Sequence, residues 1–135
     1  MITAKDVMNT WVVTTAREIS IKKAIDLMLE YKVSGLPVVD DQGQLVGIIT
    51  EKDILQLYNT FTPLENITVE KLMTAPVIHF DEDESLDDIW QCLLQKDFRR
   101  VPVTSCGKVV GIISRPDITR SILEKMRCTS PVGAK

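Results

Sequence analysis

The sequence lacks the features that mark several common classes of protein. Its 16 Lys and Arg residues are outnumbered by 19 Asp and Glu, so it has no basic excess of the kind that binds nucleic acid or an anionic membrane surface. It has three cysteines, Cys92, Cys106 and Cys128, an odd number at wide spacing that fits neither a disulfide framework nor a paired metal site. We therefore expect free thiols in a reducing compartment, and no binding to nucleic acid.

Long apolar runs are also missing. Residues 1–30 carry charged side chains such as Lys5 and Arg17 and show no apolar core of signal-peptide type. Elsewhere the apolar runs are far shorter than a membrane span. We expect a cytoplasmic protein without a membrane partner, and its 135 residues accommodate one compact unit.

The residue sets that enzymes use are absent from the sequence. It shows no nucleophile with its base, no paired catalytic carboxylates, no metal cluster and no glycine-rich phosphate loop. The acidic run 81–84 directly precedes Ser85, where negative charge in a solvated loop favours a helix N-terminus. His79, the one histidine, has no Cys or His partner nearby in the sequence. We predict that the protein is not an enzyme and has neither catalytic residues nor a metal or catalytic cofactor.

What the sequence does contain is one pattern that occurs twice. A shift of 65 positions places Met8 on Met73, and after a one-residue shortening a shift of 64 places Asp53 on Asp117. The change of register falls among turn residues, where a difference in length does little harm. The predicted organisation is repeat one at 1–58, a linker at 59–66, repeat two at 67–127 and a C-terminal tail at 128–135.

The same local structure is predicted for both repeats. Apolar residues at helical spacing predict helices that start near residues 21 and 86, with Ser20 and Ser85 as N-caps and Asp88 as a capping-box partner of Ser85. Two apolar runs around a turn then predict a hairpin, and a final helix follows. The predicted pairs of this last helix are Ile54 with Tyr58 and Ile118 with Ile122, and the prolines near the strand starts are Pro37 and Pro102. Each repeat thus reads strand, helix, strand, strand, helix, after a short lead at 3–8 or 68–73.

Packing follows from the size of the repeats. A half of about 60 residues buries too little surface to be stable alone, so we expect an α/β fold in which the two sheets pack on each other with pseudo-twofold symmetry. Gly47 and Gly111 are expected to leave room for a neighbouring segment. The duplicated apolar stripes exceed what one half can cover, which predicts a homodimer formed through the helices.

Three segments of repeat one carry a family resemblance: Asp6-Val-Met, Gly35-Leu-Pro-Val-Val-Asp, and Leu45-Val-Gly-Ile-Ile-Thr-Glu-Lys-Asp-Ile. All three recur in altered form in repeat two. By their order, spacing and duplication they resemble a tandem pair of cystathionine-β-synthase-type (CBS) repeats, known as a Bateman module. The resemblance implies a regulatory module that binds AMP, ADP, ATP or S-adenosylmethionine in clefts between the repeats and acts on a partner protein. The alternative is a CBS dimerisation or interaction module whose clefts have lost their ligand.

The resemblance points to Thr50-x-x-Asp53 and Ser114-x-x-Asp117 as ribose-binding elements. An ionised carboxylate only accepts hydrogen bonds, so it can take both hydroxyl donors of a ribose. The same spacing is also that of a capping box at a helix start, which needs no ligand. Both interpretations remain open at the level of sequence.

The resemblance also assigns residues to two clefts, because each cleft takes its first strand and the residues before the hydrophobic-Pro pair from the opposite repeat. The Asp53 cleft would contain Ile48, Ile49, Thr50, Asp53, Ile78, Arg99 and Arg100. The Asp117 cleft would contain Val13, Ser34, Gly35, Lys52, Ile112, Ser114 and Asp117. Arg99 and Arg100 fall where basic residues contact phosphates in nucleotide-binding members, although a solvated basic pair is an equally good interpretation. We expect a nucleotide to bind first in the Asp53 cleft, because the other cleft receives less positive charge; Arg115 beside it is interpreted as a surface residue.

Overall fold

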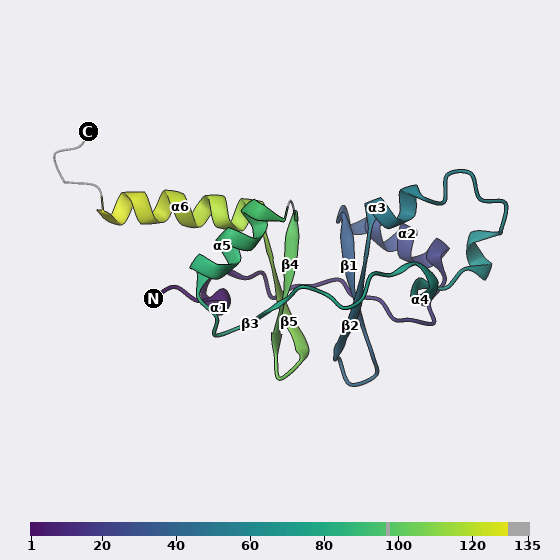
Figure 1. Cartoon of the computed structure of the whole chain (residues 1–135), viewed down its shortest axis with the longest axis horizontal. Helices are drawn as coiled ribbons and strands as arrows, with labels where there is room; N and C mark the ends of the chain where they lie inside the picture. Colours follow the sequence, from purple (N-terminus) through teal and green to yellow (C-terminus); the bar gives the residue numbers. More distant parts are fainter. Residues whose placement is uncertain (97, 130–135) are drawn as a thin grey trace.

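The computed structural model describes residues 1–96 and 98–129, and Figure 1 shows two lobes side by side along the long axis. Repeat one contains α1 (Ala4–Val7), α2 (Ile21–Tyr31), β1 (Gly35–Val39), β2 (Leu45–Thr50) and α3 (Glu51–Leu55). The linker contains the short 3-10 helix η1 (Leu64–Asn66). Repeat two contains α4 (Val69–Leu72), β3 (Phe80–Asp81), α5 (Leu86–Gln95), β4 (Arg100–Ser105), β5 (Lys108–Ser114) and α6 (Arg115–Thr129).

The predicted helix starts and hairpins are confirmed. The Ser20 hydroxyl accepts a hydrogen bond from the Lys23 N–H at 3.2 Å, which caps α2. The Ser85 hydroxyl caps α5, but it accepts from the Asp87 N–H at 3.2 Å, one residue earlier than a capping box with Asp88 requires. β1 pairs antiparallel with β2, and β4 pairs antiparallel with β5.

The bounds of several helices and strands differ from the predictions. α3 ends at Leu55, so Tyr58 lies beyond the helix with 91% of its side chain exposed, and no Ile54–Tyr58 pair forms along α3. The reason is the turn-forming composition of the linker that follows. Pro37 and Pro102 are the third residues of β1 and β4 rather than their first, and both are buried. α6 continues to Thr129, and residues 130–135 of the predicted tail lie outside the described residues.

The first strand shows the clearest departure from symmetry. In repeat two it is β3, whose Phe80 pairs with Val103 of β4 and packs against the core. In repeat one it is only a single parallel bridge between Thr15 and Val38. Thr15 is buried with its hydroxyl unpartnered, beside a hollow of about 320 Å³. A threonine fills less space than the phenylalanine at the matching position, so this lobe has the looser first strand.

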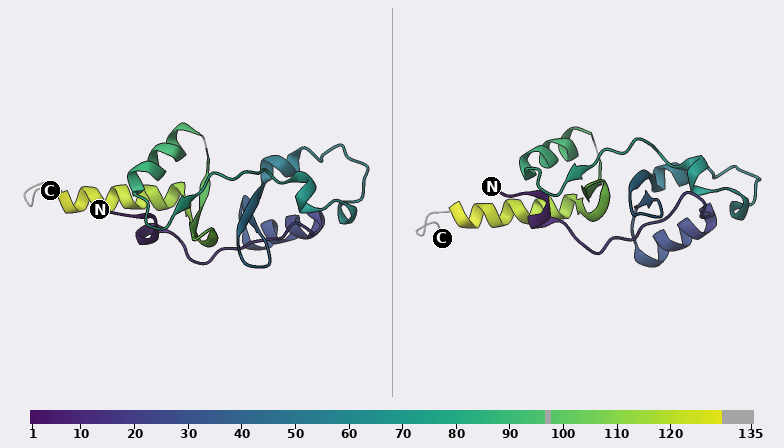
Figure 2. Two further views of the ribbon diagram at one scale, coloured as in Figure 1. Left: turned by 60° about the horizontal axis from the view of Figure 1, so that its bottom comes forward. Right: turned by 90° about the horizontal axis from the view of Figure 1, so that it is seen from below.

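The lead helices are exchanged between the lobes. α1 belongs to repeat one, yet the Ala4 N–H donates to the Glu84 carbonyl at 2.9 Å in the lobe built by repeat two. In the matching contact the Val69 N–H of α4 donates to the Ile19 carbonyl at 2.8 Å. Figures 1 and 2 show α1 beside α5 and β3, and α4 beside α2. We call the unit of β1, β2, α2, α3 and α4 lobe one, and the unit of β3, β4, β5, α5, α6 and α1 lobe two.

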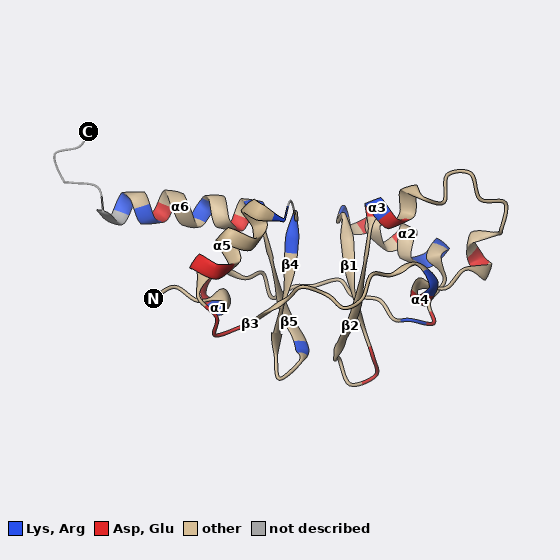
Figure 3. Cartoon of the chain, viewed as in Figure 1, with Lys and Arg blue, Asp and Glu red and all other residues tan. Residues whose placement is uncertain are grey.

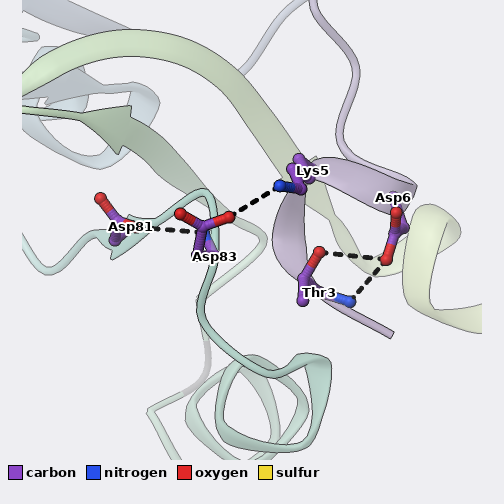
Figure 4. A network of polar contacts seen from close by, with 5 residues as sticks. All are labelled: Thr3, Lys5, Asp6, Asp81 and Asp83. Atoms are coloured by element: carbon purple, nitrogen blue, oxygen red, sulfur yellow. Dashed lines mark hydrogen bonds and ion pairs between the residues drawn. The ribbon is translucent and has the colours of Figure 1, made fainter. Parts of the chain in front are cut away.

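Salt bridges at the surface follow the same exchange. The Lys5 ammonium of α1 contacts the Asp83 carboxylate at 2.8 Å, and Figure 4 shows this pair joining the lead helix to the loop before α5. The Asp6 carboxylate accepts from the Thr3 N–H at 2.8 Å and forms a capping box. Both charged groups of the salt bridge are exposed, so the pair adds little stability, and the exchange depends chiefly on buried contacts.

Each lobe has its own hydrophobic core, and six of the seven buried positions of one core match those of the other; Ile21 and Ile118 correspond to Leu86 and Ile54, which are only partly buried. The core of lobe one contains Ile21, Ala24, Met28, Leu36, Val38, Ile49 and Val69. The core of lobe two contains Ala4, Ile89, Leu93, Val101, Val103, Ile113 and Ile118. Val69 in lobe one is equivalent to Ala4 in lobe two, and Ala24 in lobe one is equivalent to Ile89 in lobe two. Each core thus combines one alanine with one larger residue at these two positions, so the loss of volume at one is offset at the other.

The two sheets meet at the tips of their hairpins. The Leu45 N–H donates to the Gly107 carbonyl at 3.0 Å, and the Val109 N–H donates to the Gly43 carbonyl at 3.2 Å. Positions 45 and 109, and positions 43 and 107, are equivalent under the shift of 64. Paired contacts of this kind confirm the predicted α/β fold with pseudo-twofold symmetry. None of the described helices combines the length and hydropathy that crossing a membrane requires.

Gly47 and Gly111 leave room for the exchanged leads, as predicted. A Cβ at Gly47 would lie 2.5 Å from the Met73 sulfur and 3.2 Å from the Thr74 carbonyl oxygen. A Cβ at Gly111 would collide with the Met8 side chain, and even the Cβ atom of Met8 would lie only 3.0 Å from it. Each glycine therefore lies under the methionine that follows the lead helix of the opposite repeat.

Gly111→Ala is expected to lower the free energy of unfolding by about 1–3 kcal/mol, the usual cost of forcing atoms into a packed contact. Gly47→Ala should cost less, because Met73 approaches that site only through its flexible Sδ and Cγ atoms, at 2.5 and 3.1 Å, whereas at Gly111 the Met8 Cβ, which is fixed to the backbone, also lies at 3.0 Å. Urea unfolding followed by circular dichroism measures both. Without a clash, alanine would instead stabilise by about 0.4–1 kcal/mol through the unfolded chain, and that result at position 111 would contradict the close approach.

Candidate functional site

Two crossing segments bring each repeat to the sheet of the other. The Ile48 N–H donates to the Thr74 carbonyl at 3.0 Å, and the Thr74 N–H donates back to Ile48 at 2.8 Å. Asn9 and Ile112 form the matching pair at 2.9 and 3.0 Å. From Thr74 the chain runs on to β3 in lobe two, so Ile78 lies on the crossing segment between this bridge and β3, where it is exposed.

Thr50 and Asp53 lie where β2 ends and α3 begins, and they form a capping box. The Asp53 Oδ2 atom accepts from the Thr50 N–H at 2.9 Å and from the Thr50 hydroxyl at 3.0 Å. Both bonds use the same oxygen, and among the described residues no donor reaches Oδ1. The capping interpretation is therefore confirmed for Oδ2, and Oδ1 is left to accept hydrogen bonds from a ligand.

Ser114 and Asp117 repeat this arrangement where β5 meets α6. The Asp117 Oδ2 atom accepts from the Ser114 N–H at 2.8 Å and from its hydroxyl at 2.9 Å. Here, however, Oδ1 is occupied, since the Arg120 guanidinium donates to it at 3.1 Å. Sequence reasoning missed Arg120, although an acid and a base three residues apart on a helix are neighbours and were a visible signal.

Arg99 and Arg100 lie at the start of β4, beside the first turn of α6. The Arg99 carbonyl accepts from the Arg115 N–H at 3.1 Å, and Arg100 pairs with Ser114 across the hairpin. Arg115 also donates through Nε to the Phe98 carbonyl at 2.8 Å, so its side chain supports this loop. Figure 3 shows these basic residues gathered where β4 and α6 begin. The backbone thus places the arginine pair nearer to Asp117 than the sequence suggested.

Arg100 lies between charges of both lobes. Burial lowers the pKa of its guanidinium, while the carboxylates of Glu51 and Asp117 favour the charged form and Arg99 disfavours it. Its Nε atom is buried without a hydrogen-bond partner. A half-buried cation near the starts of both α3 and α6 supplies positive charge between the lobes, although its Nε atom is itself closed to solvent.

The remaining predicted residues lie around these helix starts with different exposures. The Ser34 carbonyl accepts from the Glu51 N–H at 2.9 Å, and Gly35 is buried against β2. Lys52 is exposed on α3. Ile49 is fully buried in the core of lobe one and Val13 packs against that core, so Ile49 faces away from a cleft and only its backbone is available to a ligand.

The surface beside α6 is also hollowed. A hollow of about 750 Å³ lies along α6 and is lined by Arg115, Pro116, Thr119, Arg120, Ile122, Leu123 and Met126. Its lining is mostly apolar and includes neither of the two capping carboxylates. It marks an open helix face rather than a nucleotide cleft.

The other candidates for chemistry have structural roles. The Asp81 carboxylate accepts from the Asp83 N–H at 3.0 Å, and the Glu84 carboxylate accepts from the Asp81 N–H at 3.1 Å, so the acidic run folds into a turn. His79 is exposed, and its Nδ1 lies 2.9 Å from the Val77 carbonyl oxygen. Among residues 1–96 and 98–129 no group of three or more His, Cys, Asp or Glu side chains is placed to hold a metal ion.

The family model of the CBS domain matches residues 4–59 and 69–124. The chain belongs to the CBS domain family. The two matches correspond to the two repeats, each with its own lead helix, so this CBS pair exchanges α1 and α4 between its lobes.

Several relatives resemble this CBS pair along most of its length. It is 31% identical over 138 residues to the chloroplastic CBS domain-containing protein CBSX2 of Arabidopsis thaliana, covering 82% of this chain and 58% of that protein. It is 33% identical over 119 residues to the CBS domain-containing protein YhcV of Bacillus subtilis, covering 87% of this chain and 84% of that protein. The chain therefore spans little more than half of the full CBSX2 sequence.

Solved structures share the fold. The crystal structure of CBSX2 in complex with AMP matches with a TM-score of 0.85 at 32% identity, covering 94% of this chain and 100% of that chain. The CBS domain pair of protein MJ0100, in complex with 5′-methylthioadenosine and S-adenosyl-L-methionine, matches with a TM-score of 0.79 at 32% identity, covering 93% and 98%. These two CBS pairs bind adenosine-type ligands.

Asp117→Ala is expected to destabilise the ligand-free protein more than Asp53→Ala does. Both variants lose a helix cap, which typically costs about 0.5–2 kcal/mol. Asp117→Ala also loses the exposed pair with Arg120, which adds roughly 0.2–1 kcal/mol. Chemical denaturation of both variants measures the order. A larger loss of unfolding free energy in Asp53→Ala than in Asp117→Ala would contradict the ion pair between Asp117 and Arg120.

Proposed function

We propose that this CBS pair binds an adenosine-containing ligand, AMP, ADP, ATP or S-adenosylmethionine, in the Asp53 cleft and thereby controls a partner protein. The observation that carries the proposal is that the two oxygens of the Asp53 carboxylate have different contacts. Oδ2 of Asp53 caps α3, and Oδ1 has no donor among the described residues. A cap needs only one oxygen, so the second is available for the two hydroxyls of a ribose.

The surroundings of Asp53 suit the other parts of a nucleotide. Ile48 and Ile78 come from the strand and the crossing segment of opposite repeats, and both offer apolar contact to a base. Arg100, with its unpartnered Nε, offers charge to a phosphate near Glu51 at the start of α3. Arg99 beside it is exposed. The two structural neighbours that bind adenosine compounds support the same ligand class.

A second function has a specific observation in its favour. The capping boxes account for Thr50, Asp53, Ser114 and Asp117 without any ligand, as an interaction module with empty clefts would require. An interaction module with empty clefts, however, gives no role to the buried, unpartnered Nε of Arg100. We therefore prefer the nucleotide-binding proposal, with no catalytic role for the chain.

The affinity of an Asp53 variant tests the proposal. Hydrogen bonds to charged groups contribute about 1.5–3 kcal/mol, so Asp53→Ala should weaken nucleotide binding roughly 10- to 100-fold, whereas Asp117→Ala should change it little. Titration calorimetry of the parent against AMP, ADP, ATP and S-adenosylmethionine identifies the ligand, and the variants are then compared with it.

Asp53→Asn is the matched control, because its amide oxygen can still cap α3 while its charge is lost. A thermal melt with and without ligand shows that each variant is folded and whether it is stabilised by binding. If the parent binds none of the four compounds, or if folded Asp53→Ala binds as well as the parent, the interaction-module function replaces this one.

We also propose that two copies associate through their helices. The described helices expose many apolar side chains, namely Leu29, Leu55, Trp90, Leu94, Ile122, Leu123 and Met126. Leu29 of α2 and Leu94 of α5 occupy equivalent positions and are 72% and 69% exposed, so the apolar stripe of each helix is wider than the core that it covers. Apolar surface of this extent on a small protein marks an interaction site.

Leu94→Glu is expected to shift the protein toward a monomer, because a buried carboxylate at a helix interface is strongly unfavourable. Gln95→Glu adds the same charge at an exposed polar position of α5 and should leave the assembly unchanged. Sedimentation velocity at micromolar concentration compares both variants with the parent. A parent that sediments strictly as a monomer would rule out the dimer.

A further inference from the structure

The two capping carboxylates differ in one contact. Asp117 and Asp53 each use Oδ2 for the cap, at distances that agree within 0.1 Å, 2.8 and 2.9 Å to the backbone N–H and 2.9 and 3.0 Å to the hydroxyl. Only Asp117 also has its Oδ1 in an ion pair, with Arg120 at 3.1 Å. The carboxylate of Asp117 is 14% exposed and Arg120 is 63% exposed, so the guanidinium lies over the solvent side of the acid.

The matching position in repeat one carries a neutral side chain. Under the shift of 64, Arg120 corresponds to Gln56, the C-cap residue directly after α3. An amide brings no positive charge toward Asp53, and the described residues place no donor on its Oδ1. The repeats therefore differ at the residue one helical turn after the acid, and not in the cap itself.

We propose that Arg120 keeps the second cleft from accepting a ribose by holding the Asp117 carboxylate in this ion pair, and this rests on the proposed function. A carboxylate has about four acceptor positions, and the cap takes two of them on Oδ2. The remaining oxygen must accept from the ribose diol, and at Asp117 it faces the arginine instead. Arg120 takes one of the two acceptor positions on that oxygen, so both hydroxyls of a ribose can bond to it only if the contact with Arg120 is displaced.

Positive charge for a phosphate is not what the second cleft lacks. Arg100 is influenced by Asp117 as well as by Glu51, and Arg115 begins α6 directly beside the cap. In repeat one the position that matches Arg115 is Glu51. Cations are thus at least as close to Asp117 as to Asp53, and the occupied oxygen is the feature that separates the clefts.

Arg120 has room to leave the ion pair. Its side chain also lines the open apolar hollow along α6, together with Pro116, Thr119 and Ile122. The aliphatic part of an arginine can lie on such a surface while its charged end stays in water. Because exposed ion pairs are weak, the restraint is modest, and its removal should raise affinity by about two- to fivefold.

The test isolates the second cleft in an Asp53→Asn background, where binding to the first cleft is impaired. AMP is titrated into Asp53→Asn and into the double variant with Arg120→Gln, which introduces the residue of repeat one. The double variant should bind AMP about two- to fivefold tighter. The gain should vanish with 2′-deoxy-AMP, which lacks one hydroxyl of the diol, and when Asp117→Asn is added. The reciprocal change Gln56→Arg in the parent should weaken AMP binding by a similar factor.

The outcomes separate this inference from the proposed function. If the parent binds AMP and Arg120→Gln gives no gain, or an equal gain with 2′-deoxy-AMP, the role of Arg120 is overturned and nucleotide binding stands. If neither the parent nor the double variant binds any of the four compounds AMP, ADP, ATP and S-adenosylmethionine, both proposals are overturned. A gain that requires Asp117 and the complete diol supports Arg120 as the residue that sets which cleft is occupied.

Discussion

The exchange of the lead helices determines where everything else in this CBS pair lies. Ala4 of α1 is fully buried in the core of lobe two, and Val69 of α4 is fully buried in the core of lobe one. After each lead the chain must return to its own lobe, so two segments cross between the sheets. They bond to Ile48 and Ile112, close to the ends of β2 and β5 where the capping acids lie. Segments of both repeats therefore meet close to each capping acid, and neither lobe is complete without the other.

Local features of the fold could be predicted because they depend on neighbours in the sequence. The starts of α2 and α5 follow from Ser20, Ser85 and the apolar spacing behind them, and the repeat itself follows from a simple shift. The exchange could not be predicted in this way. The sequence predicts only a short lead at 3–8 and at 68–73, and a lead docked on its own lobe would fit that prediction equally well. The lobe on which a lead helix docks is decided by tertiary packing and by the chain connection, and a local sequence pattern contains neither.

The weak first strand of repeat one has a similar explanation. Thr15 and Phe80 are equivalent, since they pair with Val38 and Val103 in matching bridges. A threonine is well suited to a strand by propensity, so the sequence predicts strands in both repeats. The difference arises from volume, because Phe80 packs on its core while Thr15 leaves a hollow beside an unpartnered hydroxyl. Propensity describes the backbone preference of a residue and not how fully it occupies its site.

For the candidate site, the sequence offered a ribose-binding acid and a helix cap as alternatives, and the geometry makes them compatible. Spacing alone treats a carboxylate as one group, whereas in the folded chain its two oxygens have different neighbours. Oδ2 is committed to the cap in both repeats, so the helices begin in the same way. The surroundings of Oδ1 then differ according to the residue three positions later, which is Gln56 at the C-cap of α3 and Arg120 on the surface of α6; neither residue belongs to a core. Because the cap fixes the acid whatever the second oxygen contacts, the surroundings of Oδ1 can differ between the repeats without any change in the packing that positions the acid.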